Sequence, residues 1–187
     1  MKTLLTLFVF FFILSGCERN YIKDLKIEGI ALGDSLIEKY SKDEILKYQW
    51  NNYPDSGFNN SSFYPKTSTF EYDQIEVGYK TNDSRYIVHS ISGAILYDSN
   101  VENCYPKKKE IINNLSKLLK NTDWENDIYE DDKGKYDLEY ILLETGEYVS
   151  VECYDWSTDT ENNLEWVDNL QVRISSAEWE EMKNDQQ

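Results

Sequence analysis

The sequence of 187 residues contains a single histidine, His89. Histidine is the most frequent general base at neutral pH and a common metal ligand. One histidine in the middle of the chain gives neither the spacing of a metal trio nor a base with a recognised nucleophile. We therefore interpret His89 as a packed or hydrogen-bonded strand residue, and expect no enzymatic activity, no cofactor and no metal.

Basic residues are few compared with acidic ones. Nineteen Lys and Arg stand against 35 Asp and Glu, which gives a formal net charge of −16 at pH 7. Such a charge disfavours nucleic acid and anionic lipid head groups as partners, because both are polyanionic. It is compatible with solubility, with a cationic protein partner or with divalent ions. A solvated acidic surface is the simpler interpretation.

Long apolar runs are missing. The run from Leu4 to Leu14, interrupted only by Thr6, has about eleven residues, whereas a membrane-spanning helix needs ~20. Lys2 precedes the run, and small residues lead to Cys17 after it. This pattern is typical of a secretory signal peptide that is cleaved before Cys17.

Leu14-Ser15-Gly16-Cys17 resembles the lipobox of bacterial lipoproteins. The resemblance implies that Cys17 becomes the mature N-terminus and carries the lipid, so that the protein is anchored to a membrane without spanning it. Glu18 stands where aspartate is the better-known signal for inner-membrane retention, so the outer membrane is favoured. We expect a lipid-anchored protein of the bacterial cell envelope.

Three parts are expected along the chain. Residues 1–16 are a signal peptide, residues 17–25 a short lipidated tether, and residues 26–187 a single domain of ordinary size. Fifteen tyrosines and five tryptophans argue against disorder in that domain.

Cys104 and Cys153 remain once Cys17 is assigned to the lipid. An even pair in an oxidising envelope is a candidate disulfide. Two buried free thiols are the alternative. Zinc is not indicated, because two cysteines about 50 residues apart lack companion histidines.

The hydrophobic pattern predicts an α+β domain. Helical turns with a capping box at Ser41 and Glu44 begin it, and 51–62 and 123–133 are predicted as loops. Strands are predicted over 66–72, 75–80, 85–97, 136–143, 147–156 and 165–175, and helices over 35–49, 106–121 and 177–183. Short turns between strands imply an antiparallel sheet of about six strands, built as two helix–three-strand units with the helices on one face.

Leu32-Gly33-Asp34-Ser35-Leu36 resembles the first block of the GDSL esterase/lipase family, in which this serine is the nucleophile. Gly57-Phe58-Asn59-Asn60 resembles the oxyanion block of that family, with Asn60 in place of the aspartate. The C-terminal Asp-x-x-His that supplies the family's base is missing from the sequence. A serine hydrolase is thus an alternative, and the same residues also suit a helix cap.

Oxygen-bearing side chains recur at Asp155, Ser157, Asp159 and Glu161, as they do in a calcium loop. The glycine at the sixth position of such a loop is missing, and Trp166 replaces its closing glutamate. These four residues are a candidate cation site, with a polar hairpin loop as the alternative.

Segments 30–35, 42–45, 87–93 and 153–157 together resemble a family of small secreted bacterial proteins with no assigned activity. More loosely, the order of elements is similar to that of small outer-membrane-assembly lipoproteins and of the β-lactamase-inhibitor fold. Both are binding modules. We therefore expect a non-enzymatic binding or scaffolding protein, with an inhibitor of a basic enzyme such as a lysozyme as an alternative.

Overall fold

A computed structural model describes residues 21–51, 53–65, 71–98, 100–120 and 122–186. The lipobox with Cys17 lies outside the described residues, as does most of the strand predicted over 66–72. Within the described ranges, no helix is long and apolar enough to cross a bilayer.

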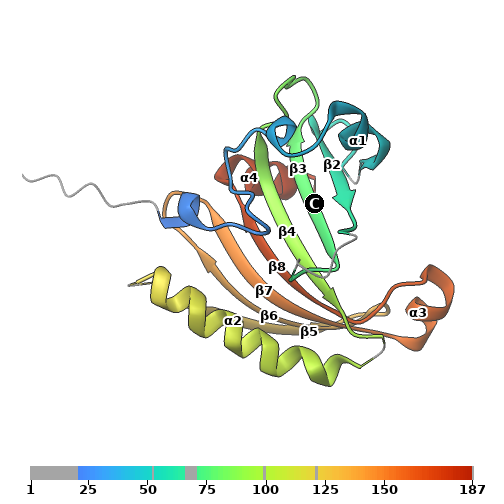
Figure 1. The fold of residues 1–187 in the computed structure, drawn as a ribbon. Coiled ribbons are helices and arrows are strands. Elements are labelled where there is room, and N and C mark those ends of the chain that lie inside the picture. Colours follow the sequence, from blue (N-terminus) through green and yellow to red (C-terminus); the bar gives the residue numbers. More distant parts are fainter. Residues whose placement is uncertain (1–20, 52, 66–70, 99, 121, 187) are drawn as a thin grey trace, which may run out of the picture.

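The described residues form one open antiparallel sheet, which is strongly curved (Figure 1). Its strands are β1 (Gln49–Trp50), β2 (Phe58–Phe63), β3 (Gln74–Lys80), β4 (Val88–Leu96), β5 (Glu125–Glu130), β6 (Gly134–Leu142), β7 (Tyr148–Trp156) and β8 (Asn169–Ser175). Their order in the sheet is β1-β2-β3-β4-β8-β7-β6-β5. The predicted α+β class and antiparallel pairing are confirmed. Each half of the chain contributes four strands rather than three, and the halves join where β4 pairs with β8.

The helices lie on both faces of the sheet. They are α1 (Lys42–Lys47), α2 (Cys104–Leu118), α3 (Thr158–Leu164) and α4 (Ala177–Asp185), with 3-10 turns at Tyr21–Asp24, Leu36–Glu38 and Val101–Asn103. Helix α2 packs along β7 and β8, and α4 contacts β4 from the other face. The prediction of helices on one face is therefore wrong for α4, which covers an apolar patch of its own around Trp179 and Met182.

The main core lies between α2, the N-terminal segment and one face of the sheet. Alternate strand residues fill it, as the period-two pattern predicts. Its strand members include Ile75, Val77, Ile91, Val149, Val151, Leu170, Val172 and Ile174. Each such side chain contributes about 1.5–3 kcal/mol on burial. The other face of the same strands is left to polar and aromatic residues.

Strands β2 and β5 lie in segments that the sequence predicts as loops. Strand β2 carries Asn-Asn-Ser-Ser, residues of low strand propensity. It is held by pairing with β3 and by Ser61, whose hydroxyl donates to the carbonyl oxygen of Ile45 at 2.8 Å. All six residues of β5 are exposed, so this edge strand lacks the alternation that marks a buried strand.

A β-bulge at His89 breaks the period-two pattern of β4. Gly78 pairs with Ser90, but Tyr79 pairs with Val88, which leaves His89 as the extra residue. Val88 and Ile91 are therefore both in the core, and His89 contacts Ser176 beside α4 instead. Strict period-two alternation along the strand predicted over 85–97 would place His89 on the same face as Ile91, and the bulge makes that expectation wrong.

Candidate ligand-binding site

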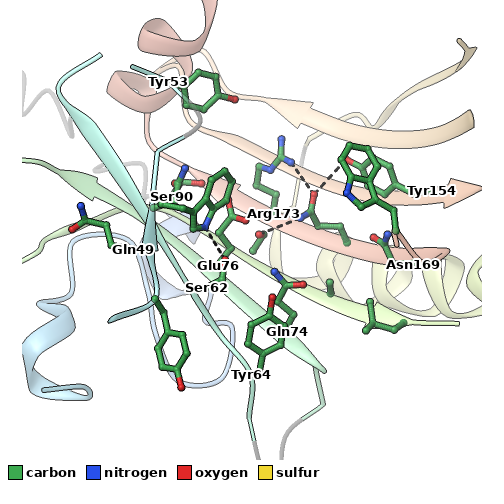
Figure 2. A pocket seen from close by; sticks show the side chains of 18 of the residues that line it. Gln49, Tyr53, Ser62, Tyr64, Gln74, Glu76, Ser90, Tyr154, Asn169 and Arg173 are labelled. Carbon is green, nitrogen blue, oxygen red and sulfur yellow. Dashed lines mark hydrogen bonds between the residues drawn. The ribbon is translucent and has the colours of Figure 1, made fainter. Parts of the chain in front are cut away.

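The sheet face opposite α2 is hollowed into an open pocket of about 920 Å³ (Figure 2). One row of paired residues crosses its floor from β2 to β8: Ser62 opposite Glu76, Glu76 opposite Ser92, and Ser92 opposite Arg173. Serines of this row, and Ser90 and Ala94 in β4, are small and leave depth above the backbone. The volume is within the range of about 300–1,000 Å³ that is typical of ligand pockets.

The residues that line the pocket are mostly aromatic or polar. Eight are aromatic, five are amides, three are serines and five are charged, whereas only Ala94 and Leu96 are aliphatic. The aromatic members are Tyr48, Trp50, Tyr53, Tyr64, Tyr154, Trp156, Trp166 and Trp179. The amides are Gln49, Asn60, Gln74, Asn169 and Gln171. Such a surface offers ring faces and hydrogen-bonding groups, and little for an acyl chain.

Aromatic clusters form two ends of the pocket. At one end Trp179 of α4 meets Phe58 edge to face, with ring centroids 5.3 Å apart. At the other end Tyr154 stacks on Trp156 with centroids 5.3 Å apart, and Trp166 meets Trp156 at 4.6 Å. Between these two ends, Figure 2 shows Glu76 and Arg173 on the floor of the pocket. Stacked and edge-to-face pairs fix ring orientation, so these walls are pre-organised.

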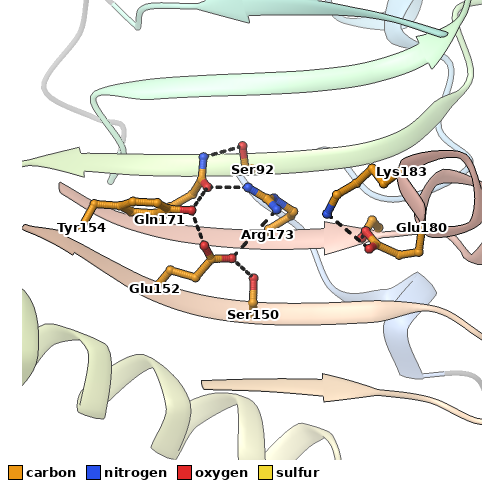
Figure 3. A network of polar contacts seen from close by, with 9 residues as sticks. Ser92, Ser150, Glu152, Tyr154, Gln171, Arg173, Glu180 and Lys183 are labelled. Carbon is orange, nitrogen blue, oxygen red and sulfur yellow. Dashed lines mark hydrogen bonds and ion pairs between the residues drawn. The ribbon is translucent and has the colours of Figure 1, made fainter. Parts of the chain in front are cut away.

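A polar network holds Arg173 in place (Figure 3). Its Nη2 donates to Oε1 of Gln171 at 2.8 Å, and its Nη1 lies 4.0 Å from Oε1 of Glu152. The amide of Gln171 donates to Oγ of Ser92 at 3.3 Å, and the hydroxyl of Tyr154 donates to Glu152. The guanidinium charge is thus largely compensated before any ligand arrives.

Two polar side chains on the floor, Asn60 and Glu76, are not held by such a network. Asn60 is only 2 % exposed, and its Oδ1 accepts no hydrogen bond from any described residue. Burial raises the pKa of the Glu76 carboxyl to about 7, and the nearby charge of Arg173 offsets this only in part. Near pH 7 Glu76 can therefore both donate and accept a hydrogen bond.

The structure gives Ser35 and His89 different partners. The Ser35 hydroxyl donates to the carbonyl oxygen of Arg85 at 2.8 Å. Nδ1 of His89 lies 3.3 Å from Oγ of Ser176 and 3.5 Å from a carboxylate oxygen of Glu178. Burial lowers the pKa of His89, which Glu178 opposes. Neither Ser35 nor His89 lines the pocket.

The four residues of the candidate cation site lie at the end of β7 and the start of α3. Ser157 is the N-cap of α3, and its hydroxyl accepts from the amide of Thr160. Asp159 and Glu161 lie in the first turn, where carboxylates interact favourably with the helix dipole. Among the described residues, no three His, Cys, Asp or Glu side chains are grouped as metal ligands. Ser157, Asp159 and Glu161 thus form a helix start, while Asp155 lies in β7 opposite Lys135.

Cys104 and Cys153 are joined by a disulfide, with Cα atoms 5.9 Å apart. The bond ties the first residue of α2 to the middle of β7, on the core side of the sheet. The structure brings the two candidate partners together, on the sheet face opposite the pocket. Cys17 is outside the described residues.

The fold and pocket define an α+β protein with a single curved sheet and an open, aromatic-walled polar site. Comparison with protein-family models, curated proteins and solved structures found no match.

The pocket was not predicted from the sequence. The available signal was the pair of small polar residues at alternate positions of β4, Ser90 and Ser92, which lie opposite Gly78 and Glu76 of β3.

Proposed function

We propose that the protein is a lipid-anchored binding protein of the bacterial envelope, which holds a ligand against the concave polar face of its sheet. The lipobox at Leu14–Cys17 supports the anchor and the location, and the aromatic-walled pocket supports the binding role. Within this proposal the protein is non-enzymatic, and its pocket selects and retains a ligand close to a membrane.

One observation carries the binding role. Asn60 lines the pocket floor, is almost fully buried, and has an Oδ1 without a hydrogen-bond donor among the described residues. A buried acceptor left unsatisfied costs about 1–3 kcal/mol. A ligand that donates a hydrogen bond to this oxygen recovers that cost, which makes the ligand-bound form the better satisfied one.

The five tryptophans provide the test. Trp50, Trp156, Trp166 and Trp179 line the pocket, whereas Trp124 donates its indole N–H to the hydroxyl of Ser116 in α2. We expect a low-molecular-weight extract of the bacterial envelope, added to the ¹⁵N-labelled protein in detergent, to shift pocket indole signals and leave that of Trp124 in place. Unchanged signals, or equal shifts of all five, would contradict the proposal.

A second candidate is capture of a cationic protein, such as a basic lysozyme, at the β5 edge. Among the described strands this one pairs with β6 alone, and its exposed residues include Glu125, Asp127 and Glu130. An open edge offers backbone hydrogen bonds to a partner strand, and the carboxylates favour a basic one. Inhibition of a basic lysozyme that weakens with added salt supports this candidate. Full lysozyme activity at low salt and excess protein argues against it.

A further inference from the structure

Building on the proposed binding function, we propose that the ligand of the pocket is a neutral oligosaccharide. A sugar ring presents one or two apolar C–H faces and a rim of hydroxyls that both donate and accept hydrogen bonds. The pocket pairs these two properties: aromatic side chains at its sides, and planar polar side chains on its floor.

The aromatic side chains at the pocket mouth are unusually open. Trp50 is 36 % exposed, Trp166 is 40 % exposed and Tyr64 is 59 % exposed. Large rings that stay in water mark interaction surfaces when they gather around a concave site. Trp50 and Tyr64 belong to the β1–β2 side and Trp166 to the α3–β8 side, so a ligand of several linked rings can contact both sides at once.

The floor offers hydrogen-bonding groups that suit hydroxyls. Each amide presents an acceptor and two donors on one plane, and can engage two neighbouring hydroxyls of a sugar. Gln74 and Asn60 on β3 and β2 lie one row to either side of Glu76. A ligand hydroxyl can donate to Oδ1 of Asn60 and accept from a neighbouring group, which few other ligand groups do. The raised pKa of Glu76 gives this carboxyl the same dual character near pH 7.

Other ligand classes fit less well. An acyl chain would meet only Ala94 and Leu96 as aliphatic neighbours. Four cations line the pocket. Arg173 faces Glu152 and Lys183 lies 3.3 Å from Glu180, so an anion would compete with these carboxylates. Lys47 and Lys133 lie over the rings of Tyr48 and Trp166, at 4.9 and 5.7 Å from the ring centroids. A peptide strand would need a sheet edge, whereas the floor is the interior of the sheet from β2 to β8, and the edge strand at the pocket, β1, is only two residues long. Of the ligand classes compared, a neutral, hydroxyl-rich one therefore fits the pocket best.

Calorimetric titration of the protein in detergent tests this inference. The probes are cellotetraose, maltotetraose and chitotetraose, with the peptide Ala-Ser-Asn-Ala as a control of similar polarity. We expect at least one tetrasaccharide to bind, and Trp166→Ala and Trp50→Ala each to weaken that binding about tenfold, which is the usual scale for loss of a stacking ring. Trp166→Phe keeps a ring and should retain most of the affinity. Trp124→Phe is the matched control and should leave it unchanged.

The outcomes separate this inference from the proposed function. A concentration of about 10 mM detects even weak binding. If no tetrasaccharide binds at that concentration, the saccharide class is wrong. It is also wrong if Trp50→Ala and Trp166→Ala both bind the tetrasaccharide as tightly as the original protein does, provided that thermal unfolding shows both variants folded. In either case pocket indole shifts caused by the envelope extract would leave the proposed binding function standing. Without those shifts, the binding function fails as well.

Discussion

Trp179 of α4 lies directly against the backbone of Gly78 in β3: a Cβ atom on Gly78 would be 2.3 Å from Cζ3 of the indole. Real Cβ atoms do not approach other carbons so closely. This contact seats α4 on the pocket side of the sheet and builds one end of the pocket. The absence of a side chain at Gly78 is therefore what allows the two elements to meet.

We expect Gly78→Ala to lower the free energy of unfolding by about 2 kcal/mol, because the methyl group forces the indole ring and α4 outward. Chemical denaturation measures this change. The double variant Gly78→Ala with Trp179→Leu gives the matched comparison: the smaller side chain should accommodate the methyl group, so the double variant should lose less than the sum of the two single losses. Simple additivity would show that the clash is not the cause.

Lys108 explains why basic residues stand at the start of α2, where the helix dipole disfavours them. Its side chain is 4 % exposed, and Nζ lies 2.5 Å from a carboxylate oxygen of Asp137 and 3.6 Å from one of Glu139. It also donates to the carbonyl oxygen of Asp137 at 3.1 Å. Lys108→Met should destabilise the protein by about 3 kcal/mol, because the partly buried carboxylates lose their counter-charge. Lys109→Met, on the exposed side of the same helix, should change stability by less than about 0.5 kcal/mol. Equal effects in thermal unfolding would contradict the assigned role.

Loss of the disulfide should strongly lower the free energy of unfolding. Cys104 and Cys153 are 49 residues apart, and closing a loop of that length in the unfolded chain contributes about 4 kcal/mol of stability on the chain-entropy model. The double variant Cys104→Ser, Cys153→Ser should unfold at a correspondingly lower denaturant concentration. Cys17→Ser, which leaves the bridge intact, is the control. Thiol labelling of the unreduced control should detect no free cysteine, and a reactive thiol there would contradict the bridge.

Glu76 should make the protein less stable as pH rises. Its pKa is about 7 in the folded protein, against 4.5 for the unperturbed group, so between these values the folded state binds more protons than the unfolded state. The free energy of unfolding should therefore fall between pH 4.5 and 7, by at most about 3 kcal/mol from this residue. Arg173 on β8 is the charged group that faces it, with Ser62 and Ser92 on the flanking strands.

Glu76→Gln isolates this effect, because the amide has the same shape and does not titrate. Urea denaturation at pH 5 and pH 8 should show a smaller fall in stability for the variant than for the original protein. Glu181→Gln, at an exposed position of α4, is the matched control and should retain the full fall. An unchanged pH dependence in Glu76→Gln would show that Glu76 ionises normally.

The parts of the fold that the sequence predicts are those with strong local signals. The α2 stripe, the alternating strands β6 to β8, the Ser41–Glu44 capping box and the C-terminal α4 appear close to the expected positions. Strands β2 and β5 were missed because neighbouring strands hold them, one despite low strand propensity and the other without a buried side. Tertiary pairing overrides local preference in both cases.

The pocket is a product of the whole sheet, which is why no local motif reveals it. Its floor joins Glu76 of β3 to Arg173 of β8, nearly 100 residues later in the chain, through the β4–β8 pairing that the sequence does not specify. The catalytic and cation motifs considered instead are local patterns. The residues Ser35 and Ser157 that prompted them act in the structure as a hydrogen-bond donor to a neighbouring loop and as a helix cap.

The ligand-binding role of the pocket is tested by replacing Asn60 with leucine and measuring stability and ligand binding together. If Asn60 is retained for a ligand, removing its unsatisfied buried oxygen should leave the ligand-free protein as stable or about 1 kcal/mol more stable. The same variant should lose the pocket indole shifts caused by the envelope extract. A variant that is strongly destabilised, or that keeps those shifts unchanged, would contradict a ligand-binding role for the pocket.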